Sequence, residues 1–244
     1  MFKQLRTIPV AIILAITIVT QVSAEEEWEY MLSPLYLWAV GLEGESQIGP
    51  ITAPVSIEFS DAVNNLDSIL TFHFEAKKGQ MGMFADAMHI SLDPESTLPN
   101  GAPVAVDLTN NIFEVGGIYR FSQAESLELL YGLRYSDFEL DAAIGPMPQA
   151  TIADESWIDG FVGLRKSIPV SDKGTFILRG DIGTGDSDLV WNAIGIFDYR
   201  FKEKFSALIG YRWLDYDYET GSGLSRFTYD IAYEGPVLGA VFYW

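Results

Sequence analysis

The sequence of 244 residues contains no cysteine, so disulfide bonds cannot stabilise its fold. Histidine is nearly absent, with two residues, and cations are few, since 15 Lys and Arg face 34 Asp and Glu for a formal net charge of -19. A chain this acidic is a poor partner for nucleic acid. After residue 24, no apolar run reaches the roughly 20 residues that a membrane-spanning helix requires. These absences exclude a disulfide-stabilised fold, a nucleic-acid-binding protein and a helical bundle in the membrane.

The first 24 residues have the pattern of a secretory signal peptide. Lys3 and Arg6 form a positively charged start, residues 8–19 are an apolar run too short to span a bilayer, and residues 22–24 are small enough for cleavage. A retained helical anchor is the alternative. We expect a cleaved signal peptide at 1–24 and a single domain at 25–244 that lies outside the cytoplasm.

Apolar and polar residues alternate through most of the domain. In "FSALIGYRW", for example, the apolar side chains occupy every second position from Phe205 to Trp213, with Arg212 on the other face. Alternation of this kind predicts strands whose two faces meet different surroundings. Ten strands are predicted, at 27–45, 67–78, 81–92, 106–121, 125–141, 155–168, 175–184, 188–201, 205–219 and 226–244.

The connections between these strands alternate in length. Short turns such as "KKGQ" and "KEK" occur at one end, and longer loops at 46–66, 93–105 and 142–154 at the other. An even number of long strands joined in this way is typical of an outer-membrane barrel. A soluble β-sandwich also has alternating strands, but charges in mid-strand and aromatic residues near strand ends favour the barrel. We therefore predict an all-β fold, a closed antiparallel transmembrane β-barrel of about ten strands, with both termini periplasmic.

The last strand requires one adjustment in this scheme. Tyr229, Ile231 and Tyr233 have one parity, and the apolar residues from Leu238 to Trp244 have the other. If both groups face lipid, the strand needs a bulge, and we predict it near Gly235-Pro236. In the first long loop, "DAVNNLD" predicts one helical turn that either caps the barrel mouth or enters it.

The terminal "VFYW", with Phe242 and Trp244, resembles the C-terminal assembly signal of bacterial outer-membrane proteins. The stretches "PLYLWAVGLEGE", "GIYRF", "FVGLR", "LRGDIG" and "GYRWLDYDY" resemble a family of small, mostly uncharacterised, porin-like Gram-negative outer-membrane β-barrels. This resemblance implies the bacterial outer membrane, insertion by the barrel-assembly machinery, and outer-membrane lipids and lipopolysaccharide as surroundings. It supplies no catalytic residue.

The polar strand faces are predicted to line the lumen with charges of both signs. They either pair and close the barrel, which we favour, or line a selective pore. The principal members of this predicted network are Glu75, Asp86, Glu114, Arg120, Arg134, Asp159, Arg165, Arg179, Asp181 and Arg212, with Glu128, Asp198, Asp230, Lys77 and Arg200 on the same faces.

The outer loops are rich in carboxylates. Asp186, Asp188, Asp215 and Asp217 are predicted to form an acidic mouth, which is either a solvated rim or a funnel for cations. Divalent cations beside lipopolysaccharide are a further partner that this rim suggests. Together these features predict a structural or narrow, cation-favouring porin-like role.

The two histidines are the remaining candidates for chemistry. His73 is predicted to join the lumen network. His89 and Ser91 face outward near the outer rim, with the His-x-Ser spacing that barrel lipid A deacylases have. We expect them to be interfacial polar residues and the protein to have no enzymatic role, with a lipid hydrolase using His89 and Ser91 as the alternative. No cofactor motif is present, so none is expected.

Overall fold

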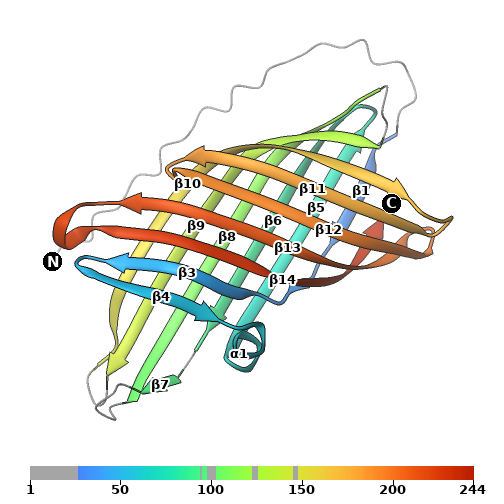
Figure 1. Ribbon diagram of the computed structural model, residues 1–244. Coiled ribbons are helices and arrows are strands. Elements are labelled where there is room, and N and C mark those ends of the chain that lie inside the picture. Colours follow the sequence, from blue (N-terminus) through green and yellow to red (C-terminus); the bar gives the residue numbers. More distant parts are fainter. Residues whose placement is uncertain (1–26, 94, 98–102, 123–125, 145–147) are drawn as a thin grey trace.

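The structure is a computed structural model that describes residues 27–244 except 94, 98–102, 123–125 and 145–147 (Figure 1). The predicted signal peptide lies outside the described residues. Among the described residues, no helix is both long and apolar enough to cross a membrane. The elements in chain order are β1 Glu29–Ser33, β2 Tyr36–Trp38, β3 Gly41–Ile48, β4 Ile51–Ile57, α1 Phe59–Asn64, β5 Leu66–Lys78, β6 Met81–Leu92, β7 Glu95–Thr97, β8 Pro103–Arg120, β9 Leu127–Ile144, β10 Ala150–Pro169, β11 Gly174–Gly185, β12 Leu189–Lys202, β13 Phe205–Thr220, a 3-10 turn Gly223–Ser225 and β14 Phe227–Tyr243.

Ten antiparallel strands form a closed barrel, as predicted. The segments β1, β2 and β3 together take the place of the first strand, and β5, β6 and β8 to β14 supply the other nine. Met31 of β1 pairs with Glu75 of β5 on one side and with Tyr243 of β14 on the other, which closes the ring. The short strands β4 and β7 lie outside the ring order and pair with β3 and β8.

The two ends of the barrel differ. The turn end holds the short turns and both ends of the described chain, where the Tyr30 N–H donates to the carbonyl oxygen of Trp244 over 2.9 Å. The loop end holds the β3–β4, β6–β8, β9–β10 and β13–β14 connections (Figure 1). We call the part of the barrel from the turn end to the level of Trp213 the turn half, and the remainder the loop half.

In the loop half the wall separates into two facing layers (Figure 1). There β3 pairs with β14 and β4, whereas β5 beyond His73 pairs, among the described strands, only with β6. Helix α1 overlaps the segment for which the sequence predicts a helical turn but begins two residues earlier, and its Ala62 is buried against the apolar side chains between the layers. The helix therefore packs at the mouth of the barrel.

The predicted bulge near Gly235-Pro236 is wrong. Strand β14 pairs with β13 without a register shift along its whole length, and Tyr229, Ile231 and Tyr233 are buried inside the barrel. The same alternation of inward and outward side chains continues along the whole strand. What changes along the strand is the medium around the barrel. Gly235 serves close packing instead, since a Cβ there would lie 1.7 Å from the carbonyl oxygen of Ala39.

The outward face carries two bands. In the turn half, exposed apolar side chains form a lipid belt that includes Phe72, Met83, Phe113, Val115, Tyr131, Leu133, Tyr135, Ile158, Val162, Leu164, Phe176, Leu178, Ile182, Trp191, Ile209, Trp213, Leu238 and Phe242. In the loop half, many outward positions of the same strands are carboxylates. This acidic collar contains Asp137, Glu139, Asp154, Asp215, Asp217, Glu219, Asp230 and Glu234. Asp230 thus faces outward, and its predicted place in the lumen is wrong.

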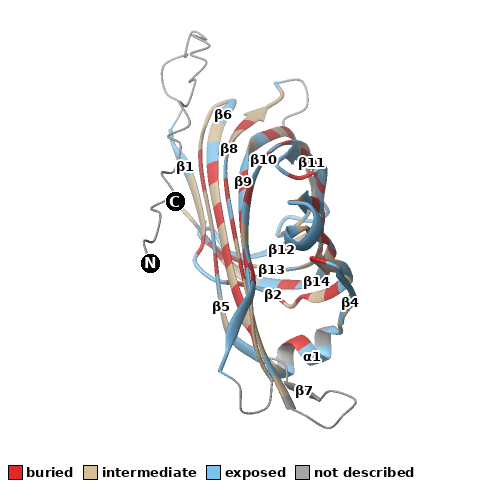
Figure 2. Ribbon diagram, turned by 90° about the vertical axis from the view of Figure 1, so that its left-hand side faces the viewer, coloured by how far each residue is buried: buried red, intermediate tan, exposed pale blue. Residues whose placement is uncertain are grey.

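The burial pattern follows the period of two that the sequence predicts. Buried residues alternate with intermediate ones along β6 and with exposed ones along the middle of β10 (Figure 2). The inward positions meet other side chains across the narrow ring, while the outward positions meet the surroundings.

Candidate functional site

A buried ion-pair network fills the middle of the barrel. Glu114 of β8 accepts from Arg134 over 2.9 Å and from Arg179 over 2.8 Å, and Arg212 of β13 lies 3.3 Å away. Because β8 and β13 lie on opposite sides of the ring, the Arg212 contact crosses the lumen. Asp181 accepts from Arg134 over 2.7 Å and from Arg179 over 2.8 Å, so each of these two arginines contacts two carboxylates.

A second group lies closer to the turn end. Glu75 is 3.1 Å from Lys77 and accepts from Arg165, which also donates to Glu128 over 2.7 Å. His73 joins this group as predicted, with its ring nitrogens 3.1 Å from Glu75 and 2.9 Å from Asp86. Charges in a confined, poorly solvated space are stable when they have such partners.

The structure places all ten predicted lumen residues on the inward face, and nine of them interact with other charged residues. Arg120, at the turn end, lies 3.6 Å from Glu128. Asp159 is the exception, because its carboxylate accepts from the backbone N–H and the hydroxyl of Ser187 over 2.9 and 2.8 Å. Asp159 therefore holds the β11–β12 connection against β10.

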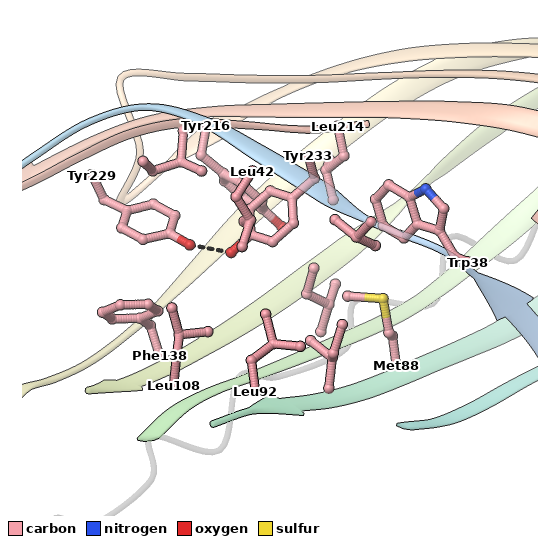
Figure 3. Close-up of a cluster of buried hydrophobic side chains, with 14 of the residues drawn as sticks. Trp38, Leu42, Met88, Leu92, Leu108, Phe138, Leu214, Tyr216, Tyr229 and Tyr233 are labelled. Atoms are coloured by element: carbon pink, nitrogen blue, oxygen red, sulfur yellow. Dashed lines mark hydrogen bonds between the residues drawn. The ribbon is translucent and has the colours of Figure 1, made fainter. Parts of the chain in front are cut away.

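The loop half contains an apolar core that the sequence analysis missed (Figure 3). Phe138 of β9 meets Tyr229 of β14 with ring centroids 4.8 Å apart, and Trp157 stacks on Tyr218 at 4.4 Å. Both contacts cross the barrel interior. Tyr216 hydrogen-bonds Ser136 over 2.8 Å, and burial raises the pKa of Tyr216 to about 12. The phenol thus stays neutral at physiological pH.

A signal for this core is present in the sequence. Along β13, Leu214, Tyr216 and Tyr218 have the parity of the buried Arg212, while Asp215 and Asp217 have the parity of Trp213. The inward face therefore becomes apolar at the point where the outward face becomes acidic.

One cavity of about 120 Å³ lies in the turn half. Aliphatic side chains, among them Ile177, Ile196 and Leu208, line one part of its wall, and His73 and Arg165 belong to the other. Its lining shares Tyr36 and Val237 with the loop-half core, and Leu208 packs against that core. The cavity is a local space beside the ion pairs.

The four predicted mouth residues lie together on the outer wall. Asp186 and Asp188 belong to the β11–β12 connection, and Asp215 and Asp217 point outward from β13. Their inward neighbours on β13, Leu214 and Tyr216, fill the interior of the barrel at this level. Burial raises the pKa of Asp217, and repulsion from Asp230, Asp188 and Glu219 raises it further. Among the described residues, no group of three or more ligating side chains is arranged to hold a metal ion.

The outward face of β5, β6, β8 and β9 carries a row of hydrogen-bonded polar side chains. His89 Nε2 lies 3.2 Å from the Ser68 hydroxyl, and His89 Nδ1 lies 2.7 Å from Asn111 Oδ1. Asn111 Nδ2 donates in turn to Asp137 over 2.9 Å. The hydroxyl partner of His89 is thus Ser68 on the neighbouring strand, rather than Ser91, which the alternative hydrolase hypothesis would use.

No family model matches the chain, and no curated protein sequence matches it. The outer membrane protease OmpT from Escherichia coli has a similar structure, with a TM-score of 0.53 at 9% identity over 89% of this chain and 96% of OmpT. The translocator domain of the autotransporter NalP from Neisseria meningitidis gives a TM-score of 0.46 at 12% identity, covering 91% and 90% of the two chains. At these identities the likeness concerns the fold alone.

The class of protein follows from the barrel and its surface. A closed antiparallel ring pairs its backbone groups between neighbouring strands, and an outward face that is a lipid belt suits it to a bilayer. The protein is an outer-membrane β-barrel, and it resides in the bacterial outer membrane.

Proposed function

We propose that this protein is a closed structural barrel, which anchors a rigid acidic extension beyond the outer leaflet and does not conduct solutes. The observation that carries this proposal is that side chains meet across the interior at two levels. Arg212 reaches Glu114 at the first level, and Phe138 packs on Tyr229 at the second. A ring of ten strands is narrow, since eight strands already enclose an interior that side chains fill.

A narrow, cation-favouring pore is the competing role. It requires an ion to pass between side chains that are paired with one another, and a funnel of carboxylates above an opening. The acidic collar lies on the outer wall, where water and lipopolysaccharide head groups surround the strands. This position supports a role in keeping the extension soluble rather than in concentrating cations.

Recording from the refolded protein in planar lipid bilayers tests the proposal. We expect no conductance steps from the wild type. A variant that truncates both levels, Phe138→Ala with Arg212→Ala, should conduct if it inserts, which establishes that the assay detects an opened barrel. Regular conductance steps from the wild type, with a reversal potential that favours cations at low salt, would contradict the closed barrel and support the narrow pore.

We also propose that the turn end faces the periplasm and that Phe242 and Trp244 guide insertion by the barrel-assembly machinery. Both side chains face the lipid side, and Trp244 stacks on Tyr30 with ring centroids 5.5 Å apart. Deleting Trp244 should lower the amount of heat-modifiable barrel in the outer membrane. Trp213→Ala removes another lipid-facing tryptophan and is the matched control, whose level should stay near that of the wild type.

A further inference from the structure

We propose that Ser68, His89 and Asn111 form a serine-hydrolase site on the outer wall of the barrel, which cleaves acyl esters of outer-leaflet lipids. This activity goes beyond the structural role, and it departs from the sequence expectation that the protein has no enzymatic role. The three side chains come from β5, β6 and β8 and form a continuous hydrogen-bonded chain. A nucleophile, a base and a group that orients the base are the parts such a site requires.

Asp137 fixes the direction of every hydrogen bond in the chain. Its carboxylate only accepts, so the amide nitrogen of Asn111 must point toward it, and the amide oxygen must then point toward His89. An amide oxygen cannot donate, so His89 carries its proton on Nδ1. Nε2 is left with a lone pair to receive the proton of the Ser68 hydroxyl. This is the tautomer that a general base needs.

Tyr135 holds the far end of the chain in place. Its hydroxyl donates to the second carboxylate oxygen of Asp137 over 3.3 Å. Asp137 is therefore bound on both oxygens, by Asn111 and by Tyr135.

The site lies at the edge of the lipid belt. In the strand register His89 pairs with Asn111, and Asn111 pairs with Asp137, while the adjacent outward row toward the turn end holds Phe72, Phe113 and Tyr135. Apolar side chains of that row fit an acyl chain. The ester group of a lipid lies where its chain meets its head group, which is the level of Ser68 and His89.

The reaction follows from these positions. Ser68 Oγ attacks the ester carbonyl as its proton moves to His89 Nε2, and a tetrahedral intermediate forms. When the C–O bond to the lipid alcohol breaks, His89 returns the proton to the leaving oxygen. Water, deprotonated by His89, then cleaves the acyl-enzyme and releases a fatty acid and free Ser68. The sum is ester plus water giving alcohol plus acid.

The backbone beside Ser68 is irregular. The β5–β6 register shifts between Leu66 and Ser68, so Asp67 has no counterpart in β6. A bulge of this kind takes a peptide group out of the regular ladder.

Covalent labelling tests the nucleophile. The refolded full chain in vesicles is treated with an alkyl fluorophosphonate, which forms an adduct with activated serine hydroxyls, and the adduct is located by mass spectrometry. We expect it on Ser68. Ser156→Ala, which removes an outward serine opposite Asp137, is the matched control and should label as the wild type does. An adduct on Ser91, or none on the folded wild type, would overturn the assignment.

Fatty-acid release tests the activity. Vesicles of phospholipid alone and vesicles that also contain lipopolysaccharide distinguish the two sources of ester. Ser68→Ala should lower fatty-acid release by about a thousandfold or more from whichever vesicles the wild type hydrolyses. His89→Gln keeps a hydrogen-bonding side chain but removes the base, so it should lose activity while the barrel stays heat-modifiable. Release that persists in both variants, or no release by the wild type in either arm, would contradict the proposal.

Asn111 is a positioning residue in this scheme, and an exchange of side chains tests it. Asn111→Ala should lower kcat while leaving KM near the wild-type value, since Asn111 acts through His89. The double variant Asn111→Asp with Asp137→Asn restores an acceptor beside His89 Nδ1 and a donor behind it. It should recover the rate, whereas a purely structural row would give no such recovery.

Discussion

The turn half and the loop half of this barrel place charged and apolar side chains in opposite ways. In the turn half, charged side chains such as Glu114 and Arg134 lie inside and apolar ones such as Leu133 lie outside. In the loop half, Phe138 lies inside and Glu139 lies outside on the same strand, β9. The strand keeps its parity, so the medium around the barrel determines which face is apolar.

The physical reason is the change from lipid to water along each strand. A tilted strand crosses the hydrocarbon in roughly 9–11 residues, and β13 is longer than this, from Phe205 to Thr220. Within the lipid, the outward face must be apolar and the polar groups gather inside. Beyond the lipid, the outward face meets water, and the two layers bury an apolar core as a soluble sandwich does.

The largest effect should come from removing the centre of the ion-pair network. Glu114→Gln leaves Arg134, Arg179 and Arg212 without their shared carboxylate, and breaking a buried pair in this way costs about 3–5 kcal/mol. Urea unfolding in vesicles measures the loss. Glu219→Gln breaks the half-exposed pair with Arg226 and should cost about 1 kcal/mol or less. Equal losses in the two variants would show that the network does not stabilise the turn half.

The apolar core of the loop half should respond to a change of volume. Leu214 is fully buried there, and Leu214→Ala should lower the free energy of unfolding by about 2–5 kcal/mol because it leaves a cavity. The same urea titration measures it. Leu224→Ala, at a side chain that is 87% exposed, should change the free energy by about 0.5 kcal/mol or less. A cost for Leu214→Ala as small as that of its control would mean that the two layers are not packed together.

The outer surface tests where the lipid ends. Leu133→Arg places a charge on the lipid belt and should cost about 2–4 kcal/mol if the position lies near the midplane. Glu139→Arg changes the same face of the same strand within the acidic collar, and we expect about 0.5 kcal/mol or less. Refolding yields and unfolding titrations in vesicles give both values. If the two substitutions cost the same, the boundary between the halves has been placed wrongly.

The smallest effect should come from the acidic collar. The pKa of Asp217 is raised in the folded protein, so its favourable contribution is present below the ordinary pKa of aspartate and is lost as the pH rises through the folded value. Asp217→Asn should therefore make the barrel slightly more stable than the wild type at neutral pH and should give no gain in acid. Urea midpoints at the two pH values measure this difference. A variant that is less stable at neutral pH would show that Asp217 has a favourable partner in the collar.

The alternation of the sequence was sufficient to predict the strands, the closed barrel and the inward position of the charges. These features depend on the parity of single residues, as for Arg134 between Leu133 and Tyr135. The alternation also places Tyr229, Ile231 and Tyr233 correctly on one common face of the strand. The error was to assume that an apolar face must meet lipid along the whole strand, which led to the predicted bulge and to the inward placement of Asp230.

Contacts between strands could not be predicted in the same way. The spacing of His89 and Ser91 places both on one face of β6, but the register with β5 brings the Ser68 hydroxyl to the imidazole instead. Likewise, no local pattern connects Arg212 with Glu114, which meet because the ring closes.

The sequence by itself determined which side chains point the same way, because the period of two is a property of the extended backbone. Only the tertiary structure decided which side chains meet, because strand register and ring closure bring together residues that are far apart in the chain. The ion pairs across the lumen, the core of the loop half and the row from Ser68 to Asp137 all belong to this second kind.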